Sequence, residues 1–206
     1  MLEKAMLNFA LLGAGWVLWL LLFLSLLCVG VGIFIVLNLL TGGSPRVPFE
    51  LAVGSFLGGG PAAELEGKLA GMRGLEARVV LSGLRARVAH AAESAMLGTL
   101  LFEKLRLERG LIIVGTVAST AAFIGLFGTV LGIIGAFHNL SLETDESAKA
   151  VMADISEALV STAVALMVAI PAVVLYNFLM RWTRSMVSRT ESLAQLVVAR
   201  LRADGS

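Results

Sequence analysis

The sequence predicts an all-α membrane protein with three transmembrane helices. Of its 206 residues, 58% are hydrophobic, and the mean hydropathy is +0.91. A soluble domain of this size needs more polar surface than such a composition provides. Residues 5–45, 110–142 and 158–180 carry no Asp, Glu, Lys or Arg. Each of these stretches can hold the roughly 20 apolar residues that cross a bilayer core.

The first charge-free stretch is longer than one membrane crossing requires. Trp16 and Trp19 are typical of interfacial anchors, so we expect the first transmembrane helix at 16–40. Residues 1–15 then form an N-terminal interfacial amphipathic segment. A signal peptide is the alternative, but the apolar run is too long and no small-residue cleavage site follows a short apolar core.

Residues 41–109 are predicted to form a loop followed by a helical region. Residues 41–61 contain six glycines and three prolines, which predicts a loop. From residue 62, apolar residues recur at three- and four-residue intervals, as in an amphipathic helix. Glycines at 67, 71, 74 and 83 weaken the case for one unbroken helix.

The second and third transmembrane helices are predicted at 110–137 and 151–180, joined by a loop at 138–150. A helical pattern beginning near Met96 enters the second span without a cluster of helix breakers. The third helix is expected to continue into the tail at 181–206. Both helices should therefore be long and extend out of the membrane.

The distribution of basic residues predicts the orientation. Residues 41–109 contain nine Lys and Arg and residues 181–206 contain five, whereas residues 138–156 contain one lysine. Basic segments next to membrane spans stay in the cytoplasm. The long loop and the tail are therefore expected inside the cell, and the N-terminus and the short loop outside.

One face of the second span carries small side chains and one hydroxyl. Gly125, Gly128 and Gly132 lie on the same side of an ideal helix as Thr129, while bulky residues point the other way. Small faces let membrane helices approach closely.

The third span repeats this pattern around Thr162. Its small residues are Ala158, Ala165 and Ala169, with Ser161 at the edge of the face. Thr129 and Thr162 lie about 14 and 18 Å from the outer loop at 1.5 Å per residue, so both are predicted near mid-membrane. Each hydroxyl either bonds back to its own helix or lines a polar path.

Glu157 is the carboxylate closest to the charge-free part of the third span. It is either a functional acid at the membrane edge or an ordinary glutamate favoured by the helix dipole. On an ideal helix it points about 140° away from Thr162. No titratable relay lies deep in any predicted span, so a proton path here would need a carboxylate from another chain.

Three motifs together resemble a known family. They are Gly-Leu-Phe-Gly-Thr-Val at 125–130, Ile-Ser-Glu-Ala-Leu-Val-Ser-Thr-Ala at 155–163 and Val-Ala-Ile-Pro-Ala at 168–172. They resemble the MotA/TolQ/ExbB proton-channel family over about residues 103–181. Three spans with a large loop after the first are similar to its ExbB/TolQ branch. Ala122 departs from the proline usual before the first motif, and Asn38 stands near the place of a missing Glu–Arg pair.

The resemblance implies a homopentameric ring with the second and third spans around a pore. A dimer of a single-span partner of the ExbD/TolR type would occupy the pore and supply a proton-carrying aspartate. Thr129, Thr162, Glu157 and Ser161 would then belong to the proton pathway or pore lining. The residues packing around the partner would be Gly125, Gly128, Gly132, Ala158, Ala165 and Ala169.

The implied function is an ExbB-like proton-channel subunit in the bacterial inner membrane, with a periplasmic N-terminus and a cytoplasmic C-terminus. It would energise outer-membrane transport through a TonB-like protein. The alternatives are TolQ-like envelope maintenance with a TolA-like protein, a gliding-motility stator and a non-conducting scaffold. We expect no enzyme activity, no cofactor and no nucleic-acid partner. We also expect no metal site, since His90 and His138 have no further metal ligands at suitable spacing.

Overall fold

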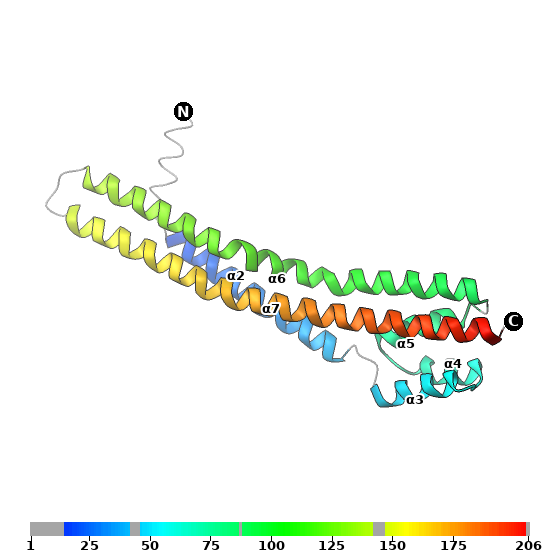
Figure 1. Cartoon of the computed structure of the whole chain (residues 1–206). Helices are drawn as coiled ribbons and strands as arrows, with labels where there is room; N and C mark the ends of the chain where they lie inside the picture. The colour runs from blue at the N-terminus through cyan, green and yellow to red at the C-terminus, as the bar shows by residue number, and fades with distance from the viewer. Residues whose placement is uncertain (1–14, 42–45, 87, 142–146, 205–206) are drawn as a thin grey trace. The chain divides into compact units, whose positions relative to one another are not determined.

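Every element of secondary structure in the described residues of the computed structural model is an α-helix, which confirms the predicted all-α class (Figure 1). The structure describes residues 15–41, 46–86, 88–141 and 147–204. Most of the predicted N-terminal segment and the middle of the outer loop lie outside these ranges. Three of the helices are long and apolar enough to cross a membrane.

The three long helices are α2 (Gly15–Thr41), α6 (Ala89–Leu140) and α7 (Ser147–Asp204). With 52 and 58 residues, α6 and α7 are each more than twice as long as a membrane crossing of about 20 residues. Helix α6 begins seven residues before the predicted start at Met96, and α7 continues through Arg181 to Asp204. Pro171 lies inside α7 with an exposed side chain.

The chain divides into two compact units. The membrane unit comprises residues 1–33 and 112–178, and the charged unit comprises residues 34–111 and 179–206. Fourteen of the sixteen Lys and Arg residues fall in the charged unit. Helices α2, α6 and α7 contribute to both units, while the short helices belong to the charged unit alone.

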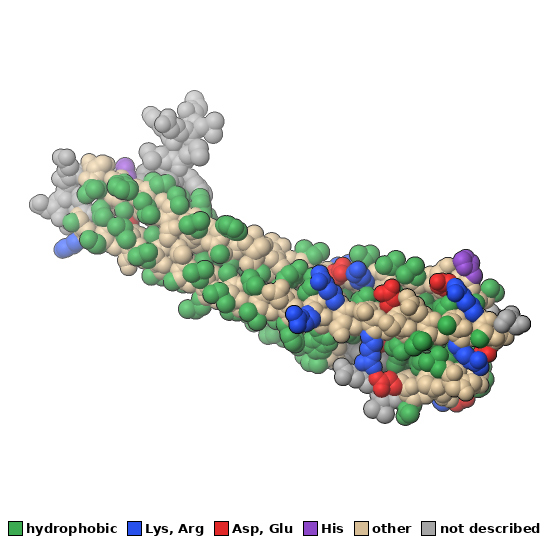
Figure 2. Space-filling model, in the orientation of Figure 1, with side chains coloured by type: hydrophobic (Ala, Val, Ile, Leu, Met, Phe, Trp, Pro, Cys, Tyr) green, Lys and Arg blue, Asp and Glu red, His purple; other side chains and the backbone are tan. Residues whose placement is uncertain are grey.

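The membrane unit exposes large apolar side chains on all three of its helices. Phe23 of α2, Phe123 of α6 and Met167 of α7 are 61%, 70% and 74% exposed. Figure 2 shows hydrophobic side chains and few charges over these helices. Such a surface suits a hydrocarbon environment rather than water, because apolar surface is costly to hydrate.

The charged unit has its own hydrophobic core. Helices α3 (Arg46–Leu57), α4 (Ala62–Ala70) and α5 (Leu75–Leu84) pack beside the ends of α6 and α7. The fully buried core side chains include Phe56, Leu65, Leu69, Val79, Val80, Met96 and Val197. The glycine at position 83 leaves room for Met96, since a Cβ there would be 2.0 Å from the methionine Cε.

The prediction of a loop over 41–61 is wrong for 46–57, where α3 forms. Pro48 is the third residue of α3 and lies in its first turn, where a missing backbone N–H breaks no helical hydrogen bond. The chain leaves the helix only at Gly58–Gly60, and Gly59 adopts a φ of 108° that favours glycine.

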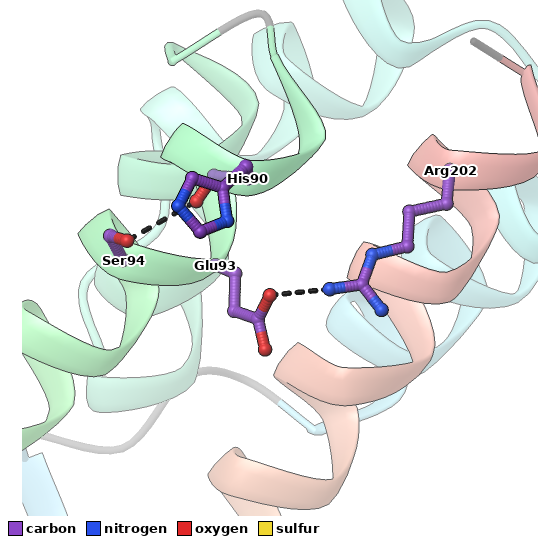
Figure 3. A network of polar contacts seen from close by, with 4 residues as sticks. All are labelled: His90, Glu93, Ser94 and Arg202. Atoms are coloured by element: carbon purple, nitrogen blue, oxygen red, sulfur yellow. Dashed lines mark hydrogen bonds and ion pairs between the residues drawn. The ribbon is translucent and has the colours of Figure 1, made fainter.

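Ion pairs join the charged unit's helices. Arg202 near the end of α7 donates to Glu93 of α6 at 2.5 Å, and Ser94 donates to the carbonyl of His90 at 3.2 Å (Figure 3). A second pair joins Arg189 of α7 to Glu50 of α3. Most of these side chains are exposed, so each pair contributes at most about 1 kcal/mol.

Candidate functional site in the membrane unit

Helices α6 and α7 run antiparallel and contact each other through small residues. Gly115 faces the Tyr176 ring, and Gly132 faces Ala158. Between these contacts, Gly125 faces Ala165. The order along α6 is the reverse of the order along α7, so the two helices keep one register along the membrane unit.

These contacts between small residues form the α6–α7 seam. Its glycines leave no room for a side chain. A Cβ on Gly125 would be 2.2 Å from the Ala165 Cβ, and a Cβ on Gly132 would be 2.5 Å from the Ala158 Cβ. A Cβ on Gly128 would be 2.5 Å from the Ser161 Oγ. Close backbone approach of this kind gives van der Waals contact between membrane helices.

Thr162 joins the two helices by a hydrogen bond. Its Oγ1 donates to the carbonyl of Gly125 on α6 at 3.0 Å. The side chain is partly exposed and lies at the edge of the seam. The sequence left open whether this hydroxyl bonds back to its own helix. In the structure it bonds to α6 instead.

Thr129 does bond back to its own helix. Its Oγ1 donates to the carbonyl of Leu126 at 2.7 Å, and the side chain is partly exposed. Because Gly128 faces Ser161, Thr129 lies within about one helical turn of the level of Thr162. The two hydroxyls therefore occupy similar depths on neighbouring helices.

Each of the two threonine hydroxyls donates its single proton in a hydrogen bond to a carbonyl. A hydroxyl has one donor and two acceptor lone pairs, so each oxygen can still accept hydrogen bonds. Since both side chains are partly exposed, water or a protonated carboxyl of another chain can donate to them. The site is therefore suited to accept hydrogen bonds from a donor rather than to gain or lose a proton itself.

The α6–α7 seam also contains Ser161, Ala158 and Ala165, which are predicted for the lining or for packing. Ser161 is fully buried, donates to the carbonyl of Ala158 at 2.8 Å and contacts Gly128. Ala165 and Ala169 are also buried. Within the single chain the residues of the seam pack against the other helix of the pair, and the packing of these small residues around a partner helix stays a prediction.

Glu157 lies beside the described start of α2. A Cβ on Gly15 would be 3.1 Å from the Glu157 Oε1, and the glutamate is partly buried. The structure thus brings Glu157 to α2, whereas Thr162 bonds to α6. The role of Glu157 in a proton pathway stays a prediction.

The sequence interpretation missed a polar contact at the end of the seam formed by the C-terminal part of α6 and the N-terminal part of α7. Asn139 Nδ2 donates to Asp154 Oδ2 at 2.7 Å, and Gly135 lies against the same carboxylate. In the sequence, Asp154 is one of several acidic residues between the second and third charge-free stretches. Its position four residues before Ala158 was a usable signal, because it places Asp154 on the small face.

No cluster of three or more His, Cys, Asp or Glu that could hold a metal occurs in the described ranges. The polar groups that the described membrane unit carries near the seam include hydroxyls, backbone carbonyls, the Asn139 amide and the carboxylates of Asp154 and Glu157.

Comparison with known proteins finds several similar chains. The chain is 44% identical over 96 residues to the "Biopolymer transport protein ExbB" of Neisseria gonorrhoeae, covering 47% of this chain and 44% of that protein. It is 39% identical over 92 residues to the protein of that name in Xanthomonas campestris pv. campestris, covering 45% and 36%. It is 41% identical over 87 residues to the protein of that name in Aquifex aeolicus, covering 42% of this chain and 59% of that protein. The matched parts thus span 36–59% of these relatives' lengths.

A family model matches a larger part of the chain. The model of the MotA/TolQ/ExbB proton channel family matches residues 72–192. This range includes all of α6 and most of α7, and hence both threonines and their seam. The chain belongs to the MotA/TolQ/ExbB proton channel family, and its curated relatives support the ExbB branch.

Proposed function

We propose that this chain is an ExbB-like proton-channel subunit of a motor driven by the proton-motive force in a bacterial inner membrane. The observation that carries the proposal is the pair of partly exposed hydroxyls, Thr129 and Thr162, at similar depth in charge-free helices. Membership of the proton channel family supports the same function.

The proposed complex is a homopentamer with α6 and α7 around a central pore. The pore holds a dimer of an ExbD-type single-span protein, whose aspartate carries the proton. No Asp, Glu, His, Lys or Arg lies deep in the predicted spans of this sequence, which supports a carboxylate from another chain. In this arrangement the N-terminus is periplasmic and the C-terminus cytoplasmic, as the basic residues favour.

The proposed chemistry follows from the hydroxyl geometry. A protonated partner carboxyl donates its single O–H to the hydroxyl oxygen of either Thr129 or Thr162, whose own protons are held by carbonyls. After the proton leaves to the cytoplasmic side, the carboxylate can no longer donate this bond and the partner helix moves to the next subunit. The chain itself makes and breaks no covalent bond, so we propose no enzymatic activity.

The work done by the motor is proposed to be outer-membrane transport through a TonB-like protein. The name "Biopolymer transport protein" of the relatives supports this task over TolQ-like envelope maintenance or gliding motility. The accompanying genes distinguish these three tasks, because each uses a different envelope protein. A non-conducting scaffold needs the small seam but not the threonines.

The experiment that tests conduction against a scaffold replaces the hydroxyls. Thr129→Val and Thr162→Val are each expected to abolish transport activity in cells while the ring still assembles, and we expect the same of Glu157→Ala. Thr120→Val is the matched control, because Thr120 bonds back to the carbonyl of Thr116 on the opposite side of α6 from Thr129. Unchanged transport in Thr129→Val, Thr162→Val and Glu157→Ala would favour the non-conducting scaffold.

A further inference from the structure

Helices α2, α5, α6 and α7 enclose a small polar pocket in the charged unit. The cavity has a volume of about 80 Å³, enough for several water molecules or one phosphate group. Its polar lining consists of Asn38, Arg78, Glu103 and Arg106. Leu39, Leu75, Leu107 and Met186 complete it. We propose that this pocket binds the phosphate headgroup of an anionic phospholipid.

The charges of the pocket leave one guanidinium for a ligand. Arg78 holds the buried Glu103 with two bonds, Nε to Oε1 at 2.9 Å and Nη2 to Oε2 at 3.0 Å. This pair neutralises the only carboxylate in the lining. Arg106 is exposed and forms no ion pair with any described residue. The pocket is therefore net positive, and the Asn38 amide adds a neutral donor.

The depth of the pocket matches the headgroup layer of a bilayer. Arg109 is the last charge before the second charge-free stretch, and Arg106 lies about 4.5 Å beyond it at 1.5 Å per residue. Met186 lies about 7.5 Å beyond Arg181, the first charge after the third stretch. The layer outside the hydrocarbon core is about 5–8 Å thick on each side. Both lining residues fall within that distance.

Exposed apolar side chains that are adjacent in sequence to the lining residues can receive the acyl chains. Leu37 and Leu40 of α2 are 55% and 64% exposed, and Leu105 of α6 is 62% exposed. A phospholipid fits both the positive pocket and the apolar side chains, since it joins an anion to two hydrocarbon chains. Free phosphate fits only the positive pocket. Basic pockets between membrane helices on the cytoplasmic side bind anionic headgroups in this way.

The test measures lipid binding by native mass spectrometry of the detergent-purified full chain. Phosphatidylglycerol is compared with phosphatidylcholine of the same acyl chains. We expect preferential binding of phosphatidylglycerol, and Arg106→Gln should reduce it by about fivefold, as expected for one arginine near a membrane surface. Arg184→Gln is the matched control, because Arg184 is an exposed arginine of α7 that does not line the pocket.

Three outcomes would overturn the site as proposed. The first is equal binding of the two lipids, and the second is equal loss in the Arg106→Gln and Arg184→Gln variants. The third is displacement of phosphatidylglycerol by millimolar inorganic phosphate, which would assign the pocket to free phosphate. Asn38→Leu supplies a second variant that leaves every charge in place, and it should also weaken phosphatidylglycerol binding.

Discussion

The hydroxyl of Thr162 donates across the helix pair to the carbonyl of Gly125 at 3.0 Å. The bond is possible because Gly125 lets the helices approach until its backbone lies beside Thr162. One contact thus couples the packing of the seam to the orientation of a hydroxyl proposed for conduction. Packing and conduction can be separated by choosing substitutions that change only one of them.

Thr162→Val should remove conduction at little cost in stability. Valine keeps the shape but has no donor for the Gly125 carbonyl. Hydrogen bonds between membrane helices contribute about 0.6 kcal/mol on average and at most about 1.7. Thr162→Ser retains the hydroxyl and should conserve proton flux through the purified complex. If the serine and valine variants conduct equally, the hydroxyl is not part of the path.

Gly125→Ala should destabilise the membrane unit. The new Cβ would lie 2.2 Å from the Ala165 Cβ, so the helices must move apart, at a cost of about 1–3 kcal/mol. Gly30→Ala is the matched control, because nothing lies within 4 Å of its Cβ position on α2. Unfolding of both variants in detergent gives the comparison. Adding Ala165→Gly should rescue Gly125→Ala in part, because the new Cβ would still lie 3.2 Å from the Thr162 Cα. Equal stability of the two single variants would contradict the close seam.

Asn139 and Asp154 should be energetically coupled. Their hydrogen bond of 2.7 Å joins the C-terminal part of α6 to the N-terminal part of α7, and a carboxylate acceptor makes such a bond stronger than one between neutral groups. A double-mutant cycle with Asn139→Ala and Asp154→Ala should give a coupling energy of about 0.5–3 kcal/mol. Additive effects on unfolding would mean that the bond does not contribute to stability.

Arg78→Ala should destabilise the charged unit more than Arg85→Ala does. Removing Arg78 leaves the Glu103 carboxylate, 8% exposed, without its partner. Breaking a fully buried pair costs about 3–5 kcal/mol, and we expect about 1–3 here because Arg78 is 44% exposed. Arg85 pairs with Glu66 at 3.6 Å on the surface, where about 0–1 kcal/mol is usual. Equal losses on thermal unfolding would contradict this ranking.

Much of the fold could be predicted from the sequence because membrane helices leave a strong signal. Charge-free stretches and the small-residue faces of the second and third spans locate the long helices and the residues that meet between them. The error at α3 has a local cause. Proline and glycine counts indicate a loop, but Pro48 falls in a first turn, and burial of Phe49, Val53 and Phe56 stabilises the helix.

The partners of each polar side chain were less predictable. Thr129 and Thr162 have similar surroundings in the sequence, yet one bonds to its own helix and the other across to Gly125. That difference depends on how far the helices approach, which a periodic pattern does not specify. The contacts of Asp154 with Asn139 and of Glu157 with α2 depend in the same way on tertiary packing.

The most direct test of the central claim measures proton flux into liposomes with an imposed potential. The chain is reconstituted alone, with its ExbD-type partner, and with a partner whose membrane aspartate is replaced by asparagine. We expect flux only with the unmodified partner, and loss of that flux in Thr162→Val but not in Thr120→Val. Equal flux from the chain alone, or flux that persists with the asparagine partner, would contradict proton transfer through a partner aspartate.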